Sequence, residues 1–232
     1  MPGPTSHFSR IPAPDTPGAN GRGTETSAGA DPVLSLVIHG VFIVSGMAAL
    51  LYQMIWQRSL LVLYGSNTES VAMIVAAFLV GLGIGGLAGG VISQRKGVHL
   101  VLAFSLVELL IGCYGLGSLR LFHWVGEFTL HAGTLETGLL AFALVFVPTV
   151  LMGATLPLLV AYRVGAIGHV GRSVSWLYFV NTLGAGLGAF LAPTVFLRHF
   201  GLSGSVKAAA LLNLISASCI LGFWLWRRRR PV

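Results

Sequence analysis

Six long apolar stretches constrain the fold of this chain more than any other feature of its sequence. Each has the length of a transmembrane helix, which needs about 20 mostly apolar residues to cross about 30 Å of hydrocarbon. A transmembrane β-barrel would show short segments in which apolar and polar residues alternate, and none of the six does. We therefore predict an all-α fold, a polytopic membrane helix bundle of about six transmembrane helices. The stretches are Val33–Trp56, Ser70–Ser93, Val98–Leu119, Gly138–Tyr162, Val174–Leu197 and Val206–Trp226.

The composition excludes a water-soluble enzyme and favours the lipid bilayer as the main partner. Only 9% of the 232 residues are charged and 55% are hydrophobic, whereas a soluble domain carries roughly a quarter of its residues as charged side chains. The net charge of +7 does not indicate a nucleic-acid partner. The basic residues flank the ends of the apolar stretches and do not form one basic face.

Lysine and arginine are distributed unequally between alternate connections, which predicts the orientation. One side of the membrane would carry eight basic residues and the other side four, namely Arg58, Arg120, Arg198 and Lys207. Because basic residues gather on the cytoplasmic side, we expect a multi-pass protein of the inner (plasma) membrane with both termini cytoplasmic. The five tryptophans lie near segment ends, as in an aromatic belt: Trp56, Trp124, Trp176, Trp224 and Trp226.

The sequence divides into a tail, a membrane domain and a basic end. Residues 1–32 are rich in Pro, Gly, Ser and Thr, which predicts a disordered cytoplasmic tail. Residues 33–226 form the predicted six-helix domain, and residues 227–232 a basic cytoplasmic tail. Residues 120–137 are expected to form the one sizeable external connection.

The first three segments and the last three show the same kinds of residue pattern in the same order, which suggests an internal repeat. The first segment of each trio has a small-residue turn, Ser45–Ala48 or Met152–Thr155, and the second is rich in glycine. The third carries one strongly polar residue, Glu108 or Asn213. Three crossings per repeat would place the two copies in opposite orientations, as in many secondary carriers. Glycine-rich apolar helices also resemble one another by chance, so the sequence leaves both interpretations open.

The glycine-rich segments are best explained by close helix packing. The string from Gly81 to Gly86 matches a dinucleotide fingerprint, but that motif requires a turn between a strand and a helix, and this string lies inside an apolar stretch. Pairs of glycines four residues apart let helix backbones approach closely. We expect this role for Gly81, Gly85, Gly86, Gly90, Gly184 and Gly188.

Glu108 is the only acidic residue well inside an apolar segment. An ionised carboxylate in hydrocarbon costs at least about 2.5 kcal/mol, so Glu108 is expected to face the bundle interior and to be protonated or paired. One hypothesis is a cation or proton site at membrane depth. The alternative is a structural hydrogen bond or ion pair with Arg58, Gln53 or Asn181.

Other polar residues extend this candidate site. Tyr52, Gln53 and Trp56 are expected to line an interior groove, because polar groups that face lipid would lack partners. Pro148 and Pro157 are expected to bend or break their helix, since each removes a backbone hydrogen bond. No catalytic set and no metal-ligand spacing is apparent among the histidines, so we assign no catalytic residue, no metal and no cofactor.

Several strings within residues 41–200 are informative as a set. They are Ser45-Gly46-x-x-Ala49-Leu50-x-Tyr52-Gln53-x-x-Trp56-x-Arg58, Glu108-Leu109-x-Ile111-Gly112-x-Tyr114-Gly115, Pro148-Thr149-x-Leu151-Met152-Gly153-Ala154-Thr155-Leu156-Pro157 and Asn181-Thr182-Leu183-Gly184-Ala185. Together they resemble the membrane domain of the fused spermidine synthase-like bacterial proteins. The aminopropyltransferase domain of that family has no counterpart among these residues, so aminopropyl transfer is not assigned to this chain.

The resemblance implies a connection with polyamine chemistry and leads to two hypotheses. The first is a carrier-like domain that binds or moves a small cationic metabolite such as a polyamine, with Glu108 as counter-charge. Its other candidate ligand-binding residues are Tyr52, Gln53, Trp56, Arg58 and Asn181. The second is a non-transporting membrane anchor or assembly module for a separate aminopropyltransferase partner. No set of residues supports a membrane-embedded enzyme. The sequence leaves open whether the protein forms a homodimer.

Overall fold

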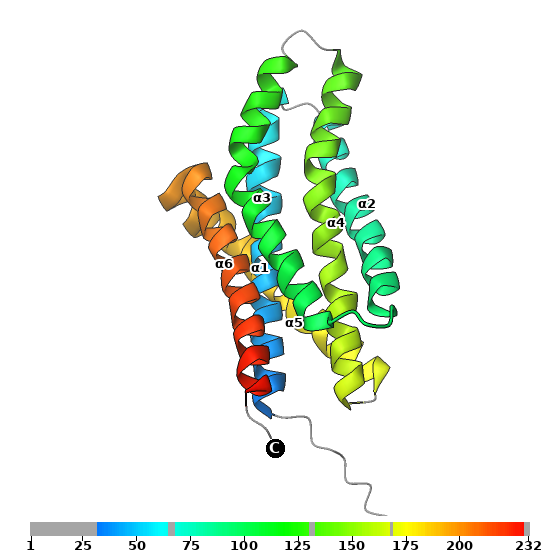
Figure 1. The fold of residues 1–232 in the computed structure, drawn as a ribbon. Helices are drawn as coiled ribbons and strands as arrows, with labels where there is room; N and C mark the ends of the chain where they lie inside the picture. Colours follow the sequence, from blue (N-terminus) through cyan, green and yellow to red (C-terminus); the bar gives the residue numbers. More distant parts are fainter. Residues whose placement is uncertain (1–31, 65–67, 130–132, 168, 230–232) are drawn as a thin grey trace, which may run out of the picture.

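The chain folds into a bundle of long helices (Figure 1). The computed structural model describes residues 32–64, 68–129, 133–167 and 169–229, so the tail predicted over residues 1–32 lies outside the described residues except for its last one, as do the last three residues of the basic end. The elements in chain order are α1 (Pro32–Tyr64), α2 (Thr68–Ser93), α3 (Leu100–Phe128), α4 (Thr134–Ile167), α5 (Val170–Leu191), the π-helical turn η1 (Ala192–Phe196) and α6 (Leu197–Arg228).

Five helical stretches of the described chain are long and apolar enough to cross a membrane. They are Ser35–Val62, Val71–Ser93, Leu100–Phe128, Leu135–Gly165 and Val170–Arg228. The chain is therefore a multi-pass membrane protein, and the predicted helical membrane bundle is confirmed. The predicted count of six crossings stays a prediction, because the last stretch joins the fifth and sixth predicted segments in one continuous run of 59 residues.

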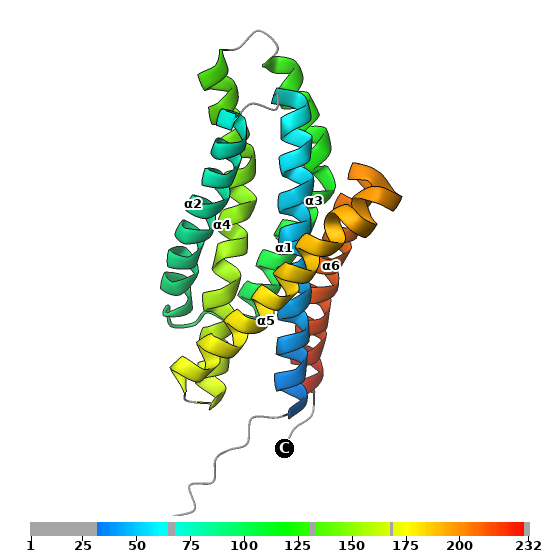
Figure 2. The same ribbon diagram turned by 180° about the vertical axis from the view of Figure 1, so that it is seen from behind.

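The chain reverses direction within that last stretch, at Gly201. Its backbone is non-helical, with φ 61° and ψ −170°, a conformation that is open almost only to glycine. After this residue α6 runs back beside α1 and α3 (Figures 1 and 2). The hydroxyl of Ser205 donates a hydrogen bond of 2.5 Å to the carbonyl oxygen of Gly201 and stabilises the start of the returning helix.

Helix α1 is central, because it contacts every other helix of the bundle. The most extensive contacts in the molecule join α2 to α4 and α1 to α5, and α3 packs against α6 and α4. Figure 2 shows α5 crossing α1 obliquely, while α2 and α4 run side by side. The fold is thus two tightly packed helix pairs, joined by α3 and α6.

The two tight pairs depend on glycines at their contacts. A Cβ atom added to Gly184 or Gly188 would overlap a backbone carbonyl of α1, and one added to Gly81 or Gly85 would overlap atoms of α4. These four glycines, expected from their spacing to pack closely, therefore lie where helix backbones approach each other.

The prediction for Gly86 and Gly90 was wrong. A Cβ atom at Gly90 would meet nothing within 4 Å, and one at Gly86 would meet only a carbonyl oxygen 4.0 Å away. Gly89 makes the contact instead, since its Cβ would overlap the backbone of Ala154. The reason is helical periodicity: Gly81, Gly85 and Gly89 follow one another at four-residue intervals on one face, and the neighbouring pair is rotated away from it.

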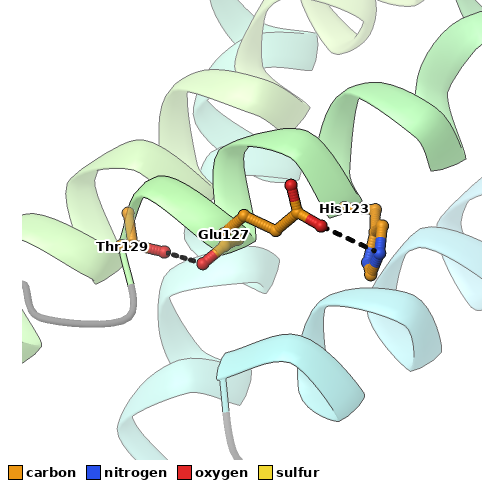
Figure 3. A network of polar contacts seen from close by, with 4 residues as sticks. His123, Glu127 and Thr129 are labelled. Atoms are coloured by element: carbon orange, nitrogen blue, oxygen red, sulfur yellow. Dashed lines mark hydrogen bonds and ion pairs between the residues drawn. The ribbon is translucent and has the colours of Figure 1, made fainter.

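The sizeable connection predicted over residues 120–137 is mostly helical. Helix α3 continues to Phe128 and α4 begins at Thr134. Figure 3 shows the last turns of α3, where His123 and Glu127 lie one turn apart with an Nε2–Oε1 distance of 3.5 Å. Thr129 ends the helix, and its hydroxyl donates to the carbonyl oxygens of Val125 and Gly126. These local polar contacts lie in the last turns of α3, beyond its apolar part.

Helix α4 stays one continuous helix through Pro148 and Pro157, so the predicted break does not occur. Pro148 has no N–H group to donate to the carbonyl oxygen of Leu144 one turn earlier. The hydroxyl of Tyr114 on α3 donates to that carbonyl oxygen instead. A neighbouring helix therefore supplies the hydrogen bond that the proline removes, as is common in membrane helices.

Candidate functional site

Glu108 lies on α3 at the place where α1, α3 and α6 meet, and its side chain is fully buried. Its Oε1 atom accepts a hydrogen bond of 2.5 Å from the hydroxyl of Ser45 on α1. Its Oε2 atom accepts one of 2.8 Å from the side-chain amide of Asn213 on α6. One carboxylate thus joins three helices that are distant in sequence.

Both hydrogen-bond donors to Glu108 are neutral. Within the described part of the chain, the one ion pair joins His123 and Glu127, far from this site at the other end of α3. Arg58, a predicted partner of Glu108, is exposed. The two hydrogen bonds of the carboxylate run to Ser45 and Asn213, not to Arg58, Gln53 or Asn181. A full negative charge on Glu108 would therefore lack a matching cation among the described residues.

Further buried oxygen atoms on α1, α3 and α6 have no hydrogen-bond partner. Four buried side-chain oxygens are unpaired: Oδ1 of Asn213, Oγ of Ser105, Oγ of Ser216 and the hydroxyl of Tyr52. Ser105 is one helical turn before Glu108, and Ser216 is one turn after Asn213, so each shares a helix face with a site residue. The site is polar, rich in oxygen and only partly satisfied by its own hydrogen bonds.

Tyr52 reaches the neighbourhood of the site from α1. Its hydroxyl lies against Gly115, where an added Cβ atom would overlap it, and Gly115 follows Glu108 by two turns of α3. The ring of Tyr52 stacks on that of Trp56, with centroids 4.6 Å apart. The absence of a side chain at Gly115 therefore makes room for the tyrosine ring beside α3.

Trp56 is part of the core and not of an aromatic belt, so that prediction was wrong for this residue. It is fully buried, and its Nε1 atom donates a hydrogen bond of 2.9 Å to the hydroxyl of Ser118. The rings of Tyr114 and Phe122 contact it edge-on, with centroid distances of 5.6 Å and 6.1 Å. Trp124, Trp176 and Trp226 are about half exposed, as belt residues would be.

The remaining predicted ligand residues lie beside the site or outside it. Asn181 is half-buried at the contact between α5 and α1, where its backbone and side-chain oxygens would overlap a Cβ on Gly46. Gln53 is half-buried on α1 and Arg58 is exposed. The structure thus brings together Glu108 and Tyr52, with Trp56 stacked behind them.

Sequence reasoning missed Ser45 and Asn213 as partners of Glu108. Both residues stood out in the internal-repeat pattern, but nothing in the spacing joined them to the carboxylate. A search for the strongest polar side chain in each apolar segment would have found Asn213. The short side chain of Ser45 carries no comparable signal.

A single carboxylate among hydroxyl and amide groups suits a small monovalent cation, a primary ammonium group or a proton. Divalent ions such as Ca²⁺ take six to eight oxygen ligands, often from several carboxylates. Over residues 32–229, as far as they are described, no group of three His, Cys, Asp or Glu side chains is placed to hold a metal ion. The chemistry of the site is therefore that of one buried carboxyl group.

Comparison with known protein families, curated proteins and solved structures finds no match to this chain. The resemblance to the membrane domain of spermidine synthase-like proteins therefore stays a prediction. The function has to be argued from the buried carboxylate and from the way the helices pack around it.

Proposed function

We propose that this chain is a carrier-like membrane domain that binds a small cation at Glu108, with the ammonium group of an amine such as a polyamine as the preferred ligand. One observation carries the proposal. A fully buried carboxylate has only neutral hydrogen-bond donors in the described part of the chain. A bound cation would provide the missing positive charge.

The energetics favour a ligand over a purely structural role. An ionised carboxylate at membrane depth costs at least about 2.5 kcal/mol. Each buried polar atom without a partner costs about 1–3 kcal/mol more, and the three helices that form this site carry four such oxygens. A purely structural site would be expected to satisfy them. An ammonium group has three N–H donors and matches unpaired acceptor oxygens such as Oδ1 of Asn213.

Three matched contacts support the inverted repeat that is part of this proposal. Carbonyl oxygens of α4 lie against Gly85 and Gly89 of α2 at Val150 and Ala154. Carbonyl oxygens of α1 lie against Gly184 and Gly188 of α5 in the same way. The α1 residues involved are Ile43 and Met47. In the third pair, Gly153 lies against the carbonyl oxygen of Leu82, and Gly46 against that of Asn181.

These contacts correspond at constant sequence offsets. The same difference in residue number relates Ile43, Gly46 and Met47 of α1 to Val150, Gly153 and Ala154 of α4. A second constant difference in residue number relates Leu82, Gly85 and Gly89 of α2 to Asn181, Gly184 and Gly188 of α5. Chance similarity between glycine-rich helices would not reproduce three contacts in one register. The packing therefore favours two related halves with opposite orientations, as in carriers.

Under this repeat, Glu108 and Asn213 are equivalent residues of α3 and α6. A hydrogen bond between equivalent residues lies on the axis that relates the two halves, because the axis exchanges its two ends. Carrier binding sites are commonly found at the interface of such repeats, near the bilayer midplane. The proposed cation site would therefore lie at the centre of the pseudo-symmetric bundle.

The proposed topology has six crossings, with both termini in the cytoplasm. The reversal at Gly201 supports a division of the last helical stretch into two crossings. The start of α1 and the end of α6 lie at the same end of the bundle (Figure 1). The connections at that end carry more lysine and arginine than those at the other, which favours the cytoplasmic side of the inner membrane.

The decisive experiment compares ligand-dependent thermal unfolding of the purified protein in detergent. Putrescine, spermidine, sodium and potassium are added in series to the wild type, to Glu108→Gln and to Glu127→Gln. A ligand at 100 times its dissociation constant stabilises the folded state by about 2.7 kcal/mol, which is visible as a shifted midpoint. Glu127→Gln is the matched control, because it removes an exposed carboxylate from the same helix.

We expect a shift with at least one amine in the wild type and in Glu127→Gln, but not in Glu108→Gln. A glutamine can still accept from Ser45 and bond to Asn213 through its amide, so the variant should fold. If only sodium or potassium shifts the midpoint, the ligand of the site is an alkali cation and not an amine. The absence of any shift in the wild type would reject the cation site and favour the anchor for a separate aminopropyltransferase.

A further inference from the structure

A second buried charge lies at the end of the bundle where α1 begins and α4 ends. The side chain of Arg163 on α4 is 9% exposed. Its guanidinium donates a hydrogen bond to Nε2 of His39 on α1. The ring of Trp176 on α5 contacts the histidine edge-on, with centroids 6.4 Å apart. Residues from three helices thus meet at His39.

His39 is held in its neutral form by its own hydrogen bonds. Its Nδ1 atom lies 2.5 Å from the carbonyl oxygen of Ser35, which can only accept, so Nδ1 carries a proton. The Nε2 atom must then be free of a proton, because it accepts from Arg163. The histidine therefore neither adds to the positive charge of the arginine nor offsets it.

Arg163 has no counter-charge among the described residues. The only ion pair in the described ranges joins two residues at the other end of α3. The Nε atom of Arg163 is buried and has no hydrogen-bond partner. A cation removed from water without a counter-charge is costly, and arginine keeps its charge at any physiological pH. The arrangement calls for an anion that the described residues do not supply.

The depth of Arg163 indicates the kind of anion. The residue lies near the end of the apolar stretch Leu135–Gly165, and His39 lies near the start of Ser35–Val62. Both are therefore at the level where a bilayer places its headgroups. Basic pockets between transmembrane helices on the cytoplasmic side are suited to anionic headgroups, and the planar guanidinium matches phosphate geometry.

The neighbouring start of α5 adds to the positive potential. Helix α5 begins at Val170, shortly after α4 ends, and His169 makes no side-chain hydrogen bond that would cap it. Free amides at a helix start attract anions. Arg172 lies in the first turn of the same helix and is exposed.

We infer that Arg163, with His39 and the start of α5, binds a phosphate group at the cytoplasmic end of the bundle. The site is separate from Glu108 and does not depend on the proposed cation binding. A phospholipid headgroup and a free phosphate share the chemistry that the site recognises. The experiment distinguishes these two sources.

Thermal unfolding of the purified full chain in a neutral detergent tests the inference. The additions are phosphatidylglycerol, diacylglycerol as a lipid without phosphate, and inorganic phosphate. The variants are Arg163→Gln and, as a matched control, Arg198→Gln, which removes an exposed arginine at the other end of the bundle. We expect phosphatidylglycerol to raise the midpoint of the wild type and of Arg198→Gln, and diacylglycerol to leave it unchanged.

Arg163→Gln should lose this shift. An equal shift with inorganic phosphate, also lost in Arg163→Gln, would assign the site to free phosphate. A phosphatidylglycerol shift that survives in Arg163→Gln, or no shift with either phosphate compound, would overturn the inference. If Arg163→Gln does not fold, intact-mass measurement of the wild type in mixed micelles shows whether a phospholipid stays bound. A retained phospholipid supports the site and its absence rejects it.

Discussion

The hydroxyl of Tyr114 on α3 bonds to the carbonyl oxygen of Leu144 on α4, the acceptor that Pro148 leaves without its helical donor. The proline in α4 removes one backbone hydrogen bond, and a tyrosine of α3 supplies a hydrogen bond to the same acceptor. We expect Tyr114→Phe to lower the free energy of unfolding by about 1–3 kcal/mol, because it leaves a carbonyl oxygen unsatisfied. Chemical denaturation in detergent measures the difference.

A double-mutant cycle isolates this effect from lost packing. Pro148→Ala restores an N–H group that can bond to Leu144 within the helix, so Tyr114→Phe should cost much less in that background. Tyr178→Phe, at an exposed tyrosine of α5, serves as the control and should be nearly neutral. Equal costs of Tyr114→Phe with and without Pro148 would show that the hydroxyl does not replace the missing donor.

The hydroxyl of Tyr52 has no hydrogen-bond partner although it is buried. We expect Tyr52→Phe to raise the free energy of unfolding by about 1 kcal/mol, because it removes a buried polar group that is not satisfied. The same variant should bind amines more weakly, since the hydroxyl is a candidate ligand of the bound ammonium group. Unfolding with and without amine measures both quantities. A variant that is less stable without ligand would contradict the unpaired state of this hydroxyl.

The equivalence of Glu108 and Asn213 predicts the result of an exchange. The double variant Glu108→Asn with Asn213→Glu keeps one carboxylate and one amide on the proposed axis and should retain cation-dependent stabilisation. Glu108→Asn alone removes the charge and should lose the stabilisation. Asn213→Glu alone brings two carboxylates together, and their repulsion should destabilise the protein. Loss of cation dependence in a folded double variant would argue against the symmetric site.

Two glycines of α5 provide a test of close packing on one helix. Gly184→Ala should be strongly destabilising, because the added Cβ would overlap the backbone of Ile43, which cannot move aside like a flexible side chain. Gly186→Ala is the control, since a Cβ there meets nothing within 4 Å. It should be neutral or stabilise by up to about 1 kcal/mol through its helix propensity. Midpoints of thermal unfolding that do not differ would contradict the close contact of α1 and α5.

The class of the fold could be predicted from the sequence because long apolar stretches leave only membrane helices as a solution. The ends of the helices were harder to predict from the sequence. The apolar stretch predicted here ends at Leu119, whereas α3 continues to Phe128 through polar residues such as His123 and Glu127. The continuity of α4 depends on Tyr114, a residue of another helix. In α4, a tertiary contact therefore decided what the local sequence left open.

The candidate site was predicted in part for a similar reason. The cost of a charge in hydrocarbon singles out Glu108 without knowledge of the fold. Its partners Ser45 and Asn213 come from helices at opposite ends of the sequence, and only the packing of α1, α3 and α6 brings them together. Among glycines with similar spacing, the register of the helix contact selects Gly89 over Gly90.

The pairing of α1 with α5 and of α2 with α4 has a consequence for biosynthesis. The glycine contacts of these two helix pairs each join a helix of the first half of the chain to a helix of the second half. When α3 leaves the ribosome, the close-packing faces of α1 and α2 still lack their partners. Neither half can complete its packing alone, and α1 has to wait for α5. The native bundle therefore assembles late, after most of the chain has entered the membrane.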